Sequence, residues 1–112
     1  MIITYRTNKL KKQAEDLKEL AKGFGIHAKS IKTRLEELKA AQNLAVMGKI
    51  PAAYCHQLTG KDYKGHLSVR VSGNMRLIFE PNHDPPPKKE DGGLDWSQVT
   101  AITIEELCYD YH

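Results

Sequence analysis

The sequence lacks the features that mark membrane, secreted or disulfide-stabilised proteins. Its 112 residues contain no apolar run near the roughly 18 residues that a membrane-spanning helix needs. The two cysteines, Cys55 and Cys108, do not have the spacing of a metal site. The first residues do not follow the pattern of a secretory signal. We therefore expect a cytoplasmic protein with free thiols, no cofactor, no metal and no membrane association.

A strong charge of either sign is also missing. The chain has 17 Lys and Arg against 14 Asp and Glu, and its net charge of +3 is far below that of a protein that coats nucleic acid. A content of 40% hydrophobic and 28% charged residues argues against disorder as the main state. The length predicts one domain over residues 1–112. Evidence for a nucleic-acid site must therefore come from the positions of individual basic residues and not from the net charge.

The clearest pattern in the sequence is a β-hairpin. Apolar residues alternate with polar ones over residues 67–71 and again over residues 75–79, on either side of Ser72-Gly73-Asn74. Arg70 and Arg76 fall in the polar phase, so we expect both on the sheet face opposite the apolar side chains. Two arginines on one face could hold a phosphate group.

Helix-period patterns precede the hairpin. Residues 2–5 favour a short strand, and apolar spacing then predicts one helix over residues 9–22, with Asn8 as its N-cap and Gly23 as its stop. A second helix is expected over residues 29–43. We expect the two helices to form a hairpin whose apolar stripe packs on the apolar face of the strands.

The remaining segments are less regular. Residues 44–53 lose clear periodicity, and residues 54–58 are expected to be extended. The prolines and glycines of residues 81–95 predict a long exposed loop, and residues 96–107 return to β character. The chain is thus expected to be a small single α+β domain, with an N-terminal strand and a helical hairpin packed on a mainly antiparallel β-sheet.

Three short features together resemble one family. They are the His-x-Leu-x-Gly run from His56 to Gly60, the strand residue Arg76 after a turn, and the Asp-Tyr-His ending at residues 110–112. In this order they resemble the HigB branch of the RelE-type toxins, which are ribosome-dependent mRNA endonucleases of bacterial toxin-antitoxin pairs. The resemblance implies a RelE-like fold, mRNA and the ribosome as targets, and a cognate antitoxin protein of the helix-turn-helix type. The insertion at residues 81–95 departs from compact members of the family.

The resemblance also implies a metal-independent ribonuclease site, in which the RNA 2′-hydroxyl attacks the phosphate. Arg76 would supply a permanent cation for the transition state. His56, Asp110 and His112 would handle protons, with the acid and the base left unassigned. Tyr111 would stack on a base or orient a phosphate. The residues expected to bind the RNA backbone are Lys49, Lys61, Lys64 and Arg70.

One position departs from this pattern. Thr59 stands where related sequences often have a lysine, and threonine cannot neutralise a phosphate. Lys61 or Arg70 could supply that charge instead.

Other functions fit parts of the same pattern. A ParE-type toxin shares the fold and poisons DNA gyrase without a nucleolytic site, although His56 and the Asp-Tyr-His ending argue against it. A non-enzymatic module that binds RNA or an antitoxin would fit the basic helices equally well. From the residues alone, Arg70 and Arg76 could also be surface residues in ion pairs with glutamates, and His112 could be a frayed chain end. The glutamates considered for such pairs are Glu80, Glu105 and Glu106.

Overall fold

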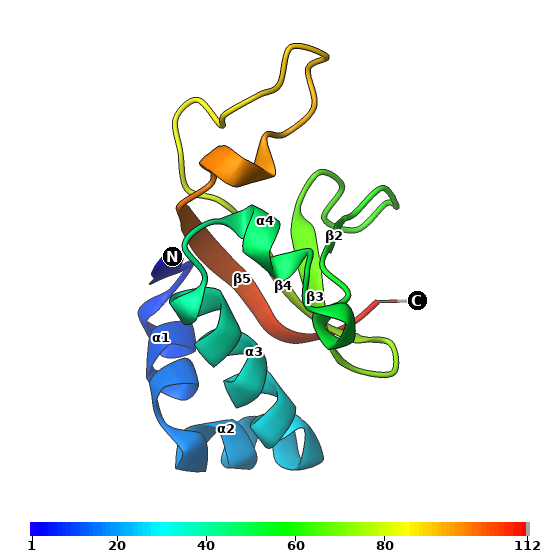
Figure 1. Cartoon of the computed structure of the whole chain (residues 1–112). Coiled ribbons are helices and arrows are strands. Elements are labelled where there is room, and N and C mark those ends of the chain that lie inside the picture. The colour runs from blue at the N-terminus through cyan, green and yellow to red at the C-terminus, as the bar shows by residue number, and fades with distance from the viewer. Residues whose placement is uncertain (112) are drawn as a thin grey trace.

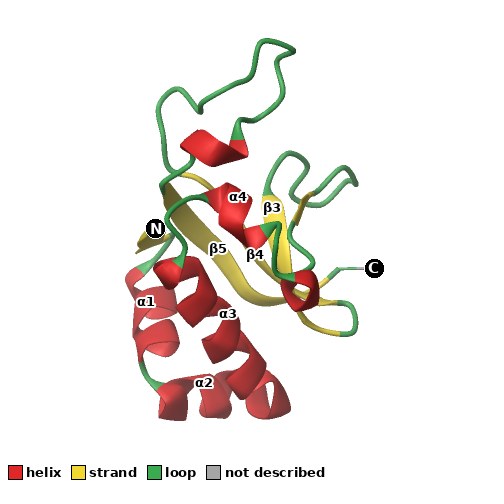
Figure 2. Ribbon diagram, in the orientation of Figure 1, coloured by secondary structure: helices red, strands yellow, loops and turns green. Residues whose placement is uncertain are grey.

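The computed structural model describes residues 1–111, and His112, an expected proton-handling residue, lies outside the described residues. Within residues 1–111 the chain forms a five-stranded sheet with helices packed on one face (Figures 1 and 2). The main helices are α1 (Asn8–Glu15), α2 (Leu17–Phe24) and α3 (Ala28–Ala40). The strands are β1 (Ile2–Tyr5), β2 (His56–Gln57), β3 (Leu67–Ser72), β4 (Met75–Pro81) and β5 (Ala101–Asp110). The predicted α+β fold class is confirmed.

The strand order of the sheet is β1-β5-β4-β3-β2. The first strand runs parallel to β5, and every other neighbouring pair is antiparallel. The predicted hairpin is β3 and β4, and Ser72 is still paired, with Met75. The turn is therefore the dipeptide Gly73-Asn74, in which Gly73 takes a φ of 54°. Glycine adopts this left-handed conformation without steric cost.

The prediction of one helix over residues 9–22 is wrong, because the helix is interrupted at Asp16. This residue is extended, with φ −130° and ψ 115°, and it separates α1 from α2. Its Oδ1 accepts a hydrogen bond of 2.9 Å from the backbone N–H of Lys18, which caps the N-terminus of α2. A short aspartate side chain can satisfy the backbone locally in this way, and it then competes with a continuous helix.

The predicted ends of these helices also shift. Thr7, not Asn8, caps α1, and its Oγ1 accepts a hydrogen bond from the backbone N–H of Leu10. Gly25, with φ 56°, ends α2 in place of Gly23. The second predicted helix, over residues 29–43, is α3 and ends at Ala40. The chain then forms the single turn α4 (Leu44–Met47) and the 3-10 turn η2 (Pro51–Ala53), in the segment whose apolar residues show no clear periodicity.

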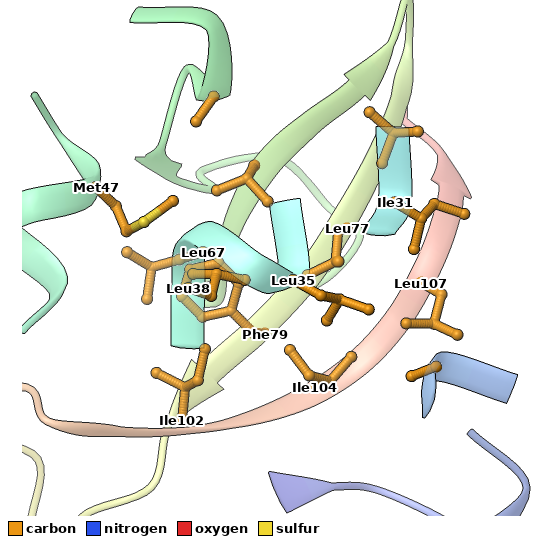
Figure 3. Close-up of a cluster of buried hydrophobic side chains, with 14 of the residues drawn as sticks. Ile31, Leu35, Leu38, Met47, Leu67, Leu77, Phe79, Ile102, Ile104 and Leu107 are labelled. Carbon is orange, nitrogen blue, oxygen red and sulfur yellow. The ribbon is translucent and has the colours of Figure 1, made fainter. Parts of the chain in front are cut away.

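Helix α3 supplies the helical side of the hydrophobic core, as expected. Its residues Ile31, Leu35 and Leu38 are buried over the apolar face of the central strands (Figure 3). Each buried side chain of this size contributes about 1.5–3 kcal/mol from the hydrophobic effect. The strand residues that face α3 in this cluster are Leu67, Leu77, Phe79, Ile102, Ile104 and Leu107.

Residues 82–95 run outside the sheet as a long loop, drawn in yellow and orange in Figure 1. The loop contains one isolated bridge, between Lys88 and Leu94. It ends at Asp95, whose Oδ1 accepts a hydrogen bond from the backbone N–H of Ser97 and begins the 3-10 turn η3 (Trp96–Gln98). In the described part of the chain, no helix is long and apolar enough to span a membrane.

Candidate active site

The candidate site lies on the sheet face opposite α3, which we call the outer face. Arg70 on β3 pairs directly with Arg76 on β4. Directly opposed residues share a face, and the neighbours Val69 and Leu77 belong to the core, so both guanidinium groups lie on the outer face. Burial and then the charge of Arg70 lower the pKa of Arg76. The sheet therefore concentrates positive charge at one point.

In the part of the chain that the structure describes, neither arginine forms an ion pair with a carboxylate. The ion pairs found among residues 1–111 all join other side chains. The alternative in which Arg70 and Arg76 pair with surface glutamates is therefore not seen in this structure. Arg76 instead donates through Nη1 to the backbone oxygen of Gly73, at 3.0 Å. This bond orients one side of the guanidinium group and leaves a fork of further N–H donors for an anion.

Strand β2 brings His56 to the same face. His56 pairs with Ser68, which lies two residues before Arg70 on β3. Its Nδ1 is 3.0 Å from the backbone oxygen of Tyr54. A carbonyl oxygen can only accept, so Nδ1 must carry the proton, and in the neutral ring Nε2 is then the basic nitrogen. The neutral tautomer is thus suited to removing a proton from a substrate.

Tyr54 joins His56 to Arg76, and the sequence analysis missed it. The Tyr54 ring centroid lies 4.7 Å from that of the His56 imidazole, and Arg76 Cζ lies 5.9 Å from the same tyrosine centroid. Tyr54 is not extended as predicted, since its φ is 43°, and the regular strand contains only His56 and Gln57. An aromatic residue two positions before the motif histidine was the available signal.

Residues 109–111 run along β4 toward the hairpin turn. Tyr109 pairs with Arg76 and Asp110 pairs with Met75, and the backbone N–H of Tyr111 donates to the oxygen of Asn74 at 2.9 Å. Tyr109 therefore shares the outer face with Arg76, whereas Asp110 has the opposite phase. The structure does not bring the Asp110 carboxylate between His56 and Arg76, and its proposed proton-handling role stays a prediction.

Gly60 of the His-x-Leu-x-Gly run lies next to Tyr111 of the C-terminal ending, so two of the features that resemble the toxin family meet here. A Cβ atom added to Gly60 would lie 2.5 Å from Tyr111 Oη. Gly60, Lys61, Asp62 and Tyr111 line a surface pocket of about 380 Å³. The motif glycine is therefore required for the space it leaves for Tyr111. Lys61 lies beside that ring, whereas the described contacts do not bring Lys49 or Lys64 to it.

Replacing Gly60 with alanine is expected to displace the ring of Tyr111, because the added methyl group would overlap Oη at the end of a rigid side chain. Because Gly60 is exposed and Tyr111 is only half-buried, the expected cost in the free energy of unfolding is about 1 kcal/mol. In a double-mutant cycle measured by urea unfolding, Gly60→Ala should cost less in the Tyr111→Ala background. Equal costs in both backgrounds would show that the two residues do not touch.

A network missed by the sequence analysis holds the loop of residues 59–66 against the outer face. The Tyr63 hydroxyl donates to the Glu106 carboxylate, and this bond raises the pKa of Tyr63 to about 12. The Tyr109 hydroxyl donates to Asp62 Oδ2 at 2.9 Å. The residues of this network come from distant parts of the chain, so their spacing in the sequence could not predict the network.

The same loop is also held by His66, which the sequence analysis gave no role. Its Nε2 lies 3.1 Å from Glu80 Oε2 and 3.6 Å from Glu105 Oε1. The ligand atoms of these three residues lie within 4.8 Å of one another, so they could hold a metal ion. Glu105 also lies 3.8 Å from Arg6 Nε. His66 and Arg6 thus face the two carboxylates, and we assign the cluster a structural role.

Arg34, on α3, supports the site from behind, and residue spacing had given it no role. Only 12% of its side chain is exposed. Its Nε donates to the backbone oxygen of Arg70 at 2.7 Å, and Nη2 donates to that of Ala52 at 3.1 Å. Glu37 Oε1 lies 2.6 Å from Nη1. One side chain of α3 thus joins β3, which carries Arg70, to the segment that leads into Tyr54 and His56.

Replacing Arg34 with methionine should lower the free energy of unfolding by about 2–4 kcal/mol, because two carbonyl groups lose charged donors. Lysine should restore only part of this loss, since one ammonium group cannot span both oxygens. Lys32→Met is the control, because Lys32 forms an exposed pair with Glu36 at 3.4 Å and should change stability by less than about 0.5 kcal/mol. Equal effects of Arg34→Met and Lys32→Met in urea unfolding would contradict the bridging role.

The architecture, an N-terminal strand and helices backing a mainly antiparallel sheet, is consistent with a RelE-like fold. The family model that matches the chain is HigB-like toxin, described as the RelE-like toxin of the type II toxin-antitoxin system HigB, and it matches residues 4–85. The chain therefore belongs to the HigB-like toxin family. Comparisons with curated proteins and with solved structures gave no match.

Family membership confirms the resemblance seen in the sequence. A toxin of a type II system has an antitoxin as its partner, so the chain is one half of such a pair. The matched range contains His56 and Arg76 and ends before β5. The proposed roles of Asp110, Tyr111 and His112 thus rest on residues outside the matched range.

Proposed function

We propose that this toxin is a ribosome-dependent mRNA endonuclease that inhibits translation. The observation that carries the proposal is the meeting of His56 and Arg76 around the Tyr54 ring. A proton acceptor and a permanent cation thus contact the same ring, on a face where no described carboxylate forms an ion pair with that cation. These are the groups that a metal-independent cleavage of RNA needs.

In the proposed reaction, neutral His56 takes the proton of the RNA 2′-hydroxyl through Nε2. The 2′-oxygen then bonds to phosphorus, and the bond from phosphorus to the 5′-oxygen breaks. Arg76, with Arg70 beside it, stabilises the added negative charge on the phosphate oxygens. The leaving 5′-oxygen takes a proton from an acid, a role for which His112 and Asp110 are the candidates by family resemblance.

The RNA itself would lie over the outer face. Lys61 and Arg70 are exposed there and can contact backbone phosphates. Lys49 and Lys64 are exposed as well, and they would extend this contact to neighbouring nucleotides. The ribosome would present the message in a single-stranded form with accessible bases.

The deciding experiment adds the purified toxin to a translating extract and maps new 5′ ends on the message by primer extension. Cleavage should occur within the translated region, and only while ribosomes are translating it. An extract in which the message keeps its original ends would contradict the proposal. If cells that express the toxin stop growing with gyrase-dependent breaks in plasmid DNA, the ParE-like function would replace it.

A further inference from the structure

Tyr54 combines an unusual backbone conformation with an exposed side chain. Its φ of 43° lies in the left-handed region, where a non-glycine residue is uncommon. It is also one of the few large aromatic or aliphatic residues left open to solvent, at 59% exposure. Strained backbone conformations persist only where the surrounding structure holds them, and they cluster at functional sites.

The surrounding structure holds Tyr54 through Arg34. If β2 continued backward in its own register, residue 54 would stand opposite Arg70, because His56 pairs with Ser68. The chain leaves the sheet instead, and Arg34 Nε takes the Arg70 oxygen that a longer strand would have bonded. Its Nη2 fixes Ala52, two residues before Tyr54. A largely buried arginine thus replaces a strand hydrogen bond and keeps Tyr54 outside the sheet.

The other tyrosines of the outer face are occupied by internal contacts. Tyr63 and Tyr109 pack edge to face at 5.3 Å, and their hydroxyl groups bind carboxylates. Tyr111 fills the space above Gly60. Tyr54 differs, since it is exposed and its ring contacts both His56 and Arg76.

We propose that Tyr54 is a binding subsite for an unpaired nucleobase beside the scissile phosphate. This inference rests on the proposed endonuclease function and names the group that the site recognises next to the phosphate. An exposed aromatic ring is a sequence-tolerant platform for a base. Arg76 nearby adds a planar cation that favours stacking and also reaches the phosphate. A base held on Tyr54 would place its adjoining phosphate between His56 and Arg76.

The test uses a short single-stranded RNA that carries 2-aminopurine, with 2′-O-methyl groups at every ribose to prevent cleavage. Stacking of 2-aminopurine on an aromatic ring quenches its fluorescence. The wild type and Tyr54→Phe should quench the probe with similar Kd. Tyr54→Leu should lose most of the quenching and bind about tenfold more weakly.

A second variant keeps the test valid if leucine disturbs the fold. Tyr54→Gly removes the ring and relieves the left-handed backbone, so it should unfold at the wild-type temperature or above it, yet lose the quenching as leucine does. Unchanged quenching and Kd in both variants, or no quenching by the wild type, would overturn the subsite. If the wild type quenches the probe but message is never cut in a translating extract, the endonuclease proposal fails and the base-binding subsite stands.

Discussion

Replacing Arg76 with alanine is expected to lower the rate of message cleavage by about 10²–10³-fold, because the transition state loses a fixed charged donor. Folding should be little affected. The variant loses one hydrogen bond, to the Gly73 oxygen at 3.0 Å, at a cost of about 1 kcal/mol. It also removes a like charge from beside Arg70, which offsets part of that cost. Arg76→Lys should restore only part of the rate, since it keeps the charge and loses the planar fork.

Arg6 provides the matched control for Arg76. It follows β1 at the edge of the sheet, its exposed side chain is 3.8 Å from Glu105, and none of its described contacts is with Tyr54, His56 or Arg76. Arg6→Ala removes the same charge from the protein and should leave the cleavage rate within about twofold of the wild type. If both arginine variants lose activity equally, the effect is one of net charge. If Arg76→Ala unfolds the protein, the residue is structural.

Replacing His56 with alanine is expected to lower cleavage by about 10²–10⁴-fold, the range for loss of a general base. The side chain is half-buried and, among residues 1–111, makes one hydrogen bond, to Tyr54 O at 3.0 Å, so the fold should survive. His56→Gln is the sharper variant. Its amide can donate to the same oxygen but has no basic nitrogen, so the site should keep its shape and still be inactive. Primer extension in a translating extract measures the rates.

His66 is the control for the histidine. It lies near the same face, but its Nε2 is engaged by Glu80 at 3.1 Å and Glu105 at 3.6 Å. His66→Gln should therefore weaken the attachment of the loop of residues 59–66 and leave the chemistry in place. An active His56→Gln variant would remove His56 from the proposed reaction and leave it a binding role at most.

The parts of the fold that follow from local pattern could be predicted from the sequence. Alternation over two strands is set by backbone geometry, so the hairpin and the shared face of Arg70 and Arg76 emerged from spacing alone. The buried stripe of α3 followed in the same way from helical period. The break at Asp16 did not, because the apolar spacing continues across it and the cap depends on a single side-chain bond.

The contacts that shape the site join residues far apart in the chain, so they could not be predicted from residue spacing. Arg34 bonds two backbone oxygens that become available only because β2 is short. Gly60 gave a motif match, but its reason, the approach of Tyr111, is a tertiary one. Strand β5 also changes register twice against β4. Simple alternation along the sequence therefore could not predict which sheet face each of its residues occupies.

The position of β5 in the sheet has a consequence for how the protein is made. This strand comes after the other four in the chain, yet it lies between β1 and β4 and supplies Ile102, Ile104 and Leu107 to the core. A nascent chain that has not reached residue 101 has nothing to join β1 to the rest of the sheet. We therefore expect the sheet to close only after β5 has been synthesised. Fragments stopped earlier by nascent-chain truncation or proteolysis should be unfolded and harmless to the cell that makes them.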